Sequence, residues 1–83
     1  MIVVVQNDGV LIPFKKFVFS VWGGNIMAAK DIIVAPSEVS PRVIATYEDN
    51  ETARKVLKDM VTRYTMGAPV YYMPQADEAE KLK

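Results

Sequence analysis

Hydrophobic positions near the start of this chain form short runs that are separated by residues favouring turns. Residues 2–5, IVVV, are β-branched and apolar on both faces, which predicts a central strand. Residues 7–9, Asn-Asp-Gly, predict a hairpin turn because Asp and Gly tolerate positive φ. Residues 10–14 are the expected returning strand. Pro13 has no N–H to donate, so we expect that end of the strand at an edge or a bulge.

The six residues 17–22, FVFSVW, show the clearest alternation of a strand. One face carries the odd positions and the other carries Val18, Ser20 and Trp22. Residues 23–25, Gly-Gly-Asn, predict the turn that ends this strand.

Two further apolar runs, residues 26–29 and 32–35, are split by a charged pair at 30–31. They are either two short strands or one strand with a bulge, and we favour two. Residues 36–41 are bounded by prolines and predict a surface loop. Residues 42–47 predict another strand, with Val43, Ala45 and Tyr47 on one face.

After residue 47 the apolar spacing changes from that of a strand to that of a helix. The repeat of three and four predicts one buried stripe, made of Ala53, Val56, Leu57, Met60, Val61 and Tyr64. Asp49 is the expected N-cap and Glu51 favours the positive end of the helix dipole. Gly67 is the expected left-handed stop. Lys55 and Asp59 are spaced as a surface ion pair.

The end of the chain predicts one short strand and then a polar segment. Residues 70–74 read as a closing strand that Pro74 ends. Residues 75–83 are polar and read either as a flexible, frayed tail or as a loose helix. We find no repeat, linker or second domain. The pattern predicts an α+β fold over residues 1–74, in which one curved antiparallel sheet of five to six strands packs on a single helix.

Composition adds limits to this picture. The chain of 83 residues has no Cys, so neither disulfides nor thiolate metal sites stabilise it. Its 51% of hydrophobic residues exceeds the needs of a small core, which favours a homo-oligomer or another protein partner. The apolar start is too short for a membrane span or signal peptide, so we expect a cytoplasmic protein without membrane contact.

The lack of His excludes most familiar catalytic chemistry. No imidazole is available for acid-base catalysis near neutral pH, for a Ser-His relay or for metal binding. No Gly-rich phosphate loop is present either. We therefore expect no enzyme, no cofactor, no bound metal and no small-molecule substrate, and a carboxylate- or Tyr-based enzyme is the least favoured class. The acidic Glu48, Asp49 and Glu51 are accounted for by the start of the helix rather than by a cation.

Several segments together resemble a group of small, mostly uncharacterised proteins of Firmicutes genomes and their prophages. These proteins begin with an I-V-x-Q-[ND] strand, return through [IV]-x-x-F, and close with Y-x-[ST]-x-x-x-A-x-x-[VI]-[LI] and [YF]-x-M-P. The matching pieces here are residues 2–7, Phe14, residues 47–57 and residues 72–74. Asp49 replaces the usual Ser or Thr and keeps the capping role. The resemblance implies a prophage accessory protein and transfers no site residues.

Two sets of residues are candidates for a working surface. Trp22 stands beside a Gly-Gly turn and opposite Phe19 in the alternation, so we expect it half-exposed and, with Val18 and Met27, at a protein interface. The basic set would bind nucleic acid through phosphates, aided by aromatic side chains of the sheet; it consists of Lys15, Lys16, Arg54 and Lys58.

Ten acidic residues balance ten basic residues, and Asp59 interrupts the basic face of the helix. A solvated helix face therefore accounts for these basic residues better than a nucleic-acid site. The leading hypothesis is a non-catalytic protein-interaction module that self-associates through an apolar sheet surface or an open strand edge. Weak, non-specific nucleic-acid binding is the alternative.

Overall fold

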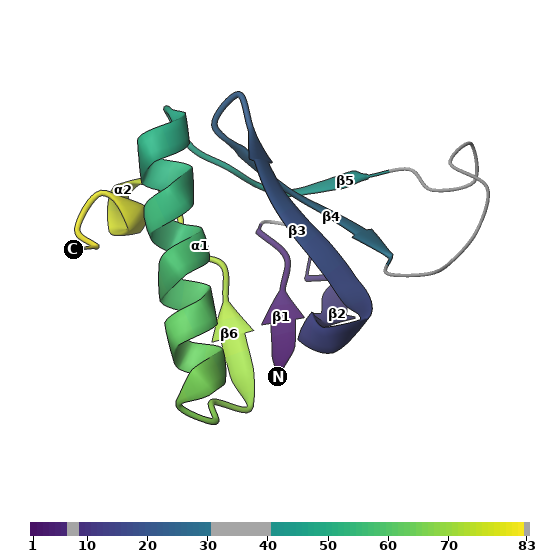
Figure 1. Ribbon diagram of the computed structural model, residues 1–83. Helices are drawn as coiled ribbons and strands as arrows, with labels where there is room; N and C mark the ends of the chain where they lie inside the picture. Colours follow the sequence, from purple (N-terminus) through teal and green to yellow (C-terminus); the bar gives the residue numbers. More distant parts are fainter. Residues whose placement is uncertain (7–8, 31–40, 83) are drawn as a thin grey trace.

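The computed structural model, which describes residues 1–6, 9–30 and 41–82, has an α+β fold (Figure 1). The first sheet has the strand order β2-β1-β6, formed by β1 (Ile2–Val4), β2 (Leu11–Pro13) and β6 (Val70–Tyr72). The second has the order β3-β4-β5, formed by β3 (Phe17–Trp22), β4 (Asn25–Lys30) and β5 (Arg42–Thr46). The helices are η1 (Phe14–Lys16), α1 (Asn50–Thr65) and α2 (Ala76–Ala79).

The α+β class is confirmed, but the prediction of one antiparallel sheet is wrong. Strand β1 pairs antiparallel with β2 and parallel with β6. The parallel pairing follows from the path of the chain, because α1 crosses from the end of β5 to β6 and returns the chain in the direction of β1. As predicted, β1 is a central strand with the buried Val3, although Ile2 on its other face is 37% exposed.

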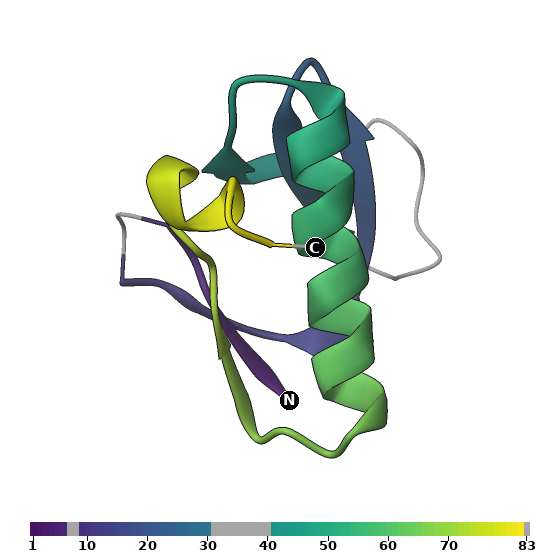
Figure 2. The same cartoon turned by 90° about the vertical axis from the view of Figure 1, so that its left-hand side faces the viewer.

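Helix α1 covers the inner faces of both sheets. Its buried residues Ala53, Val56 and Met60 belong to one hydrophobic core with side chains from each sheet. Figure 2 shows the helix in front of the strands, with β1 and β6 to one side and β3 behind it. Within the described segments, no helix is long and apolar enough to cross a membrane.

The two sheets are connected at Gln6, just after β1, where the backbone stops pairing with the β6 segment and pairs with β5. The Val4 carbonyl accepts a hydrogen bond from the Met73 N–H at 3.1 Å, and two residues later the Gln6 N–H donates to Ile44 of β5 at 3.0 Å. The Gln6 side chain completes the connection. Its Oε1 accepts from the Thr46 N–H at 2.9 Å, and its Nε2 donates to the Pro74 carbonyl at 2.9 Å. We call this set of contacts the Gln6 joint.

The β3–β4 hairpin turns through Gly23 and Gly24, both at positive φ (56° and 80°), as the type I′ turn requires. Gly24 is also packed against the start of α1. Its N–H donates to Asn50 Oδ1 at 2.7 Å, and its carbonyl accepts from the Tyr47 N–H at 2.8 Å. A Cβ at this position would lie 2.5 Å from the Tyr47 carbonyl oxygen, so only glycine fits.

The predicted ends of α1 are confirmed. Asp49 is the N-cap, and its Oδ1 accepts from the Thr52 N–H at 2.8 Å. Gly67 follows the helix with φ +83°. Two details differ from the prediction. Val61 is 45% exposed instead of buried, and the surface ion pair joins Asp59 to Arg63 at 3.8 Å rather than to Lys55.

The remaining sequence predictions concern the connecting segments and the end of the chain. The turn at 7–8, the strand at 32–35 and nearly all of the loop at 36–41 lie outside the described residues. Of the two alternatives for the segment after Pro74, the structure shows a helix: residues 76–79 form α2, whose Ala79 is fully buried in the core. The Gln75 N–H donates to Glu78 Oε1 at 3.0 Å, which stabilises the first turn of this helix.

The Gln6 joint generates a first prediction. Gln6→Ala removes two side-chain hydrogen bonds and leaves the Thr46 N–H without its partner, so it should lower the free energy of unfolding by about 1–3 kcal/mol. Tyr47→Phe removes the other donor to the Pro74 carbonyl, and its cost should be smaller. Urea denaturation of both variants and of the double variant measures the coupling. Strictly additive costs would contradict a shared joint.

A second prediction concerns the hairpin turn. Gly24→Ala should destabilise the fold by more than about 2 kcal/mol, because the added Cβ meets the Tyr47 carbonyl and φ is positive. Gly23→Asn is the matched control, since φ is positive there too but nothing lies within 4 Å, and it should cost less than about 1 kcal/mol. Thermal unfolding of both variants compares them, and equal midpoints would disprove the close approach.

A third prediction concerns acid stability. The hydrogen bond from the Thr52 backbone, aided by Lys55, holds the pKa of the Asp49 carboxyl below its ordinary value. A lowered folded-state pKa adds stability that is present above the unfolded pKa of about 3.9 and lost as the pH falls through the folded pKa. Wild type should therefore exceed Asp49→Ala in stability near neutral pH by an amount that shrinks below about pH 4. Asp49→Asn, which keeps an acceptor but cannot titrate, should cost less than Asp49→Ala at pH 7.

Candidate functional site

An apolar surface lies on the side of the β3-β4-β5 sheet opposite α1. In β3 the alternation places Val18, Ser20 and Trp22 on this outer side, and all three are exposed. Val18 is 55% exposed and Trp22 is 75% exposed. Sequence reasoning placed these side chains on one face correctly, although Trp22 is more exposed than the half-exposed position it predicted.

The strand register adds two more apolar side chains to this surface. Ser20 pairs with Met27 of β4, and Met27 pairs with Val43 of β5, so these side chains occupy one row across the sheet. Met27 is half-buried and Val43 is 44% exposed. We call the surface formed by Val18, Trp22, Met27 and Val43 the Trp22 face. The structure thus brings together the three side chains that the sequence singled out and adds a fourth.

Sequence analysis missed Val43 because it placed this residue with the buried Ala45 and Tyr47. The register between β4 and β5 shifts at Ile26 and Met27, which makes a bulge in the pairing. Ala45 pairs with Ile26 and is buried, whereas Val43 pairs with Met27 and reaches the outer face. A bulge depends on how two strands meet, so the alternation within residues 42–47 could not reveal it.

Strand β3 is also incompletely covered on its inner side. Phe17, Phe19 and Val21 point toward the core but are only half-buried, whereas Ile26 and Ala28 of the neighbouring β4 are 0% and 2% exposed. The rings of Phe14 and Phe19 stack with centroids 5.3 Å apart. Phe14 stacks in turn on Tyr64 of α1 at 4.4 Å. These rings therefore pack against the core and present no open platform for nucleic-acid bases.

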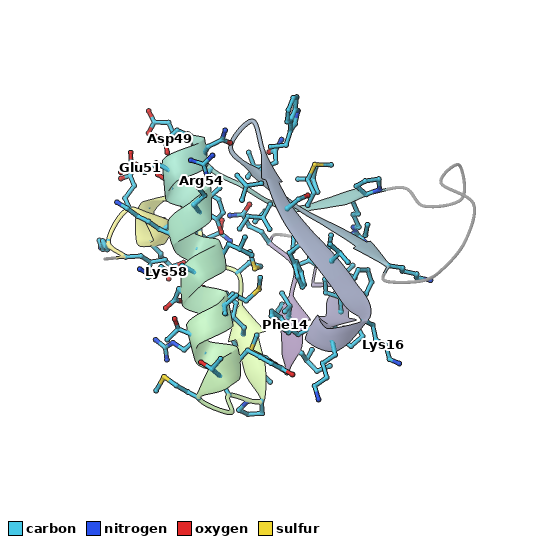
Figure 3. The ribbon with its side chains drawn as sticks, in the orientation of Figure 1. Phe14, Lys16, Asp49, Glu51, Arg54 and Lys58 are labelled. Carbon is cyan, nitrogen blue, oxygen red and sulfur yellow. The ribbon has the colours of Figure 1, made fainter. Side chains whose placement is uncertain are left out.

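The four basic candidates do not form one surface. Lys15 and Lys16 are in η1, while Arg54 and Lys58 are in α1, and all four side chains are exposed. Figure 3 shows Lys16 on the opposite side of the molecule from Arg54 and Lys58. The helix residues therefore lack the additional support from Lys15 and Lys16 that would help them bind phosphates.

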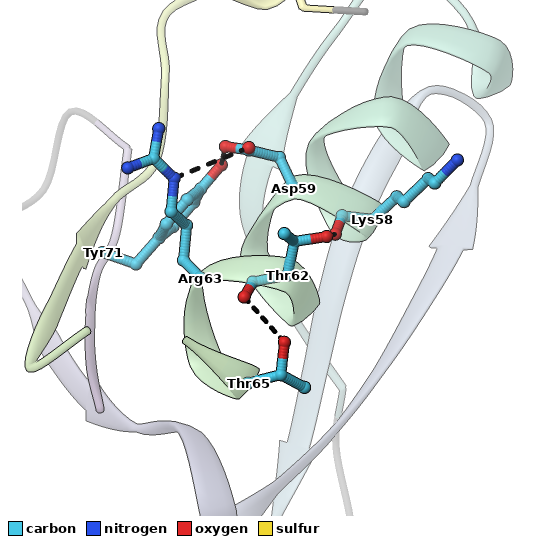
Figure 4. A network of polar contacts seen from close by, with 6 residues as sticks. All are labelled: Lys58, Asp59, Thr62, Arg63, Thr65 and Tyr71. Carbon is cyan, nitrogen blue, oxygen red and sulfur yellow. Dashed lines mark hydrogen bonds and ion pairs between the residues drawn. The ribbon is translucent and has the colours of Figure 1, made fainter. Parts of the chain in front are cut away.

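A cleft that sequence analysis did not predict lies between α1, β6 and α2. Its volume is about 420 Å³, and it is lined by Asp59, Arg63, Ala68, Val70, Tyr71, Tyr72, Pro74, Glu78 and Leu82. Figure 4 shows its polar contacts. Tyr71 Oη donates to Asp59 Oδ2 at 2.7 Å, and Arg63 Nε lies 3.8 Å from Asp59 Oδ1. In the sequence, the one feature that pointed to this cleft was Asp59, which interrupts the basic face of the helix.

The tyrosines near this cleft are poor acid-base groups at neutral pH. Burial raises the pKa of Tyr71, and its hydrogen bond to Asp59 raises it further. Burial, together with the charge of Glu78, raises the pKa of Tyr47, whose hydroxyl donates to the Pro74 carbonyl at 2.8 Å. Both phenols stay protonated near neutral pH and act as hydrogen-bond donors that tie β6 and its exit to α1 and β5.

Comparison with known proteins finds no family model, no curated protein and no solved structure that matches this chain.

Proposed function

We propose that this chain is a non-catalytic protein-interaction module that self-associates through the apolar Trp22 face or through a strand edge of the same sheet, so that Trp22 becomes less exposed. The observation that carries the proposal is the 75% exposure of Trp22 on a sheet surface that also carries the exposed Val18 and Val43. Exposed Trp side chains in apolar surroundings are the residue type that most often dominates the free energy of protein–protein binding.

The charge distribution also favours association between identical copies. The positions of β3 and β4 that face outward carry no charged side chain; the polar ones are Ser20 and Asn25. Burying these positions of β3 and β4 therefore leaves no unpaired charge among them. The formal net charge of zero removes the long-range repulsion that two copies of a charged protein would feel.

Two further features support an interaction module over the other classes. An enzyme without His would need a carboxylate, Lys, Tyr or Ser with a strongly shifted pKa, and the pKa values of Tyr47 and Tyr71 are moved away from neutrality. Nucleic-acid binding would need a continuous basic strip, and the basic residues are divided between η1 and α1. The prophage accessory setting is an expectation that depends on the resemblance alone.

The single Trp of the chain provides a direct test. If copies bury the Trp22 face, Trp emission should shift to shorter wavelength as protein concentration rises, in step with the larger mass seen by sedimentation. Trp22→Ser should weaken the association at least about tenfold, because truncating a central Trp commonly costs 2 kcal/mol or more.

Tyr72→Ser is the matched control for this test, since Tyr72 is 73% exposed but lies on the other sheet. This variant should associate like wild type. A chain that stays monomeric at millimolar concentration, or an association that Trp22→Ser leaves unchanged, would refute the proposed function.

A further inference from the structure

The two sheets have four outer edges, and they differ in how well they are protected against pairing with another strand. The edge of β2 ends in Pro13, which cannot donate a hydrogen bond. The edge of β5 is occupied by Gln6 through Ile44 and Thr46. The edge of β6 is only three residues long. Strand β3 has six residues, with no Pro and no charge, and no described strand pairs with its second edge.

The hairpin geometry identifies which backbone groups of β3 point toward this second edge. Trp22 and Asn25 flank a two-residue turn, so this pair exchanges its backbone hydrogen bonds within the hairpin. The alternation then directs Ser20 and Val18 toward β4 as well. The N–H and C=O groups of Phe19 and Val21 face outward, where no described residue pairs with them.

We propose that a second copy of the chain pairs with this edge, β3 against β3 in antiparallel orientation, about a twofold axis through Ser20. This inference rests on the proposed function and names its partner and its geometry. It would join the two β3-β4-β5 sheets into one sheet, in which each Trp22 packs beside Val18 of the other copy and loses part of its exposure.

The spacing of the side chains supports a twofold axis at Ser20. Val18 and Trp22 lie at equal distances on either side of it, so each apolar side chain would meet the other type on the second copy. In this register Phe19 pairs with Val21 of the second copy. All four outward N–H groups of the two copies then find a carbonyl. The small Ser20 side chains meet at the axis without a clash.

Charge complementarity selects a second copy over an unrelated strand. Antiparallel pairing places the start of one β3, with Lys15 and Lys16, beside the β3–β4 turn of the other copy. That turn lies against the acidic start of α1, since Gly24 donates to Asn50 and a Cβ on Gly24 would lie 3.5 Å from the Asp49 nitrogen. Figure 3 shows Lys16 and the Asp49–Glu51 region at opposite ends of the molecule, as an antiparallel dimer requires. Each basic end therefore meets one acidic end, and the twofold axis repeats this contact twice in the dimer.

The size of the contact sets the expected strength. Pairing along one short strand is small beside the roughly 800 Å² per partner of a standard interface, so we expect a dissociation constant on the order of micromolar. The dimer should be studied between about 1 µM and 1 mM.

The absence of Cys allows a clean test of the register. Ser20→Cys places the two thiols opposite each other at a position where paired Cα atoms lie about 4.5 Å apart, within the range of a disulfide. With oxidised glutathione, most of this variant should become a covalent dimer. Val18→Cys is the matched control, because its two copies would lie four residues apart along the strands, about 14 Å, and it should stay mostly uncrosslinked. Both positions are exposed, so neither change disturbs the core.

The ionic contacts give a second, independent measurement. Lys15→Glu with Lys16→Glu should weaken the dimer about threefold to tenfold at low salt, and added salt should reduce the difference. Lys58→Glu with Lys81→Glu, a change of equal charge at exposed positions outside both β3 and the acidic start of α1, should have little effect.

The outcomes separate this inference from the proposed function. Association that shifts Trp emission but gives no Ser20→Cys dimer, or that crosslinks through Val18→Cys instead, overturns the β3 geometry while the proposed function stands. A protein that is monomeric throughout overturns both.

Discussion

The structure depends on one constraint, which is that an edge of a strand can pair with only one neighbour at a time. The edge of β1 that pairs with β6 continues along the chain as far as Gln6. There the backbone pairs with β5 instead of β6. The side chain of Gln6 binds both neighbours, through Thr46 and Pro74. Because the joint lets two short sheets diverge from one strand, both can pack on the same helix and share a single core.

This arrangement also explains why so much apolar surface is left exposed. Helix α1 has one buried stripe and covers the inner side of each sheet, so the outer sides depend on other partners. On the β3-β4-β5 sheet the outer side carries Trp22 and Val18. No described strand pairs with the second edge of β3, and its inner side is only half-buried. These properties of β3 occur together because it is the strand farthest from the joint in its sheet.

The ionisable groups near the candidate sites are engaged in structural contacts. Asp49 caps α1, and Asp59 accepts from Tyr71 and pairs with Arg63. Three residues from separate matching segments of the sequence also meet at one atom, since Gln6 and Tyr47 both donate to the Pro74 carbonyl. These three residues therefore have a structural role that needs no bound partner. We look for the function on the surface of β3, where apolar side chains are exposed without such a role.

The sequence alone determined the features that depend on neighbouring residues. The limits of α1, its Asp49 cap, the Gly67 stop, the Gly23-Gly24 turn and the outward face of Val18 and Trp22 all follow from local spacing and backbone preference. Only the tertiary structure decided the division into two sheets, the parallel β1–β6 pair, the bulge that exposes Val43 and the packing of α2. Those features depend on which strand edges meet across long sequence separations, and hydrophobic alternation carries the same signal whichever partner a strand takes.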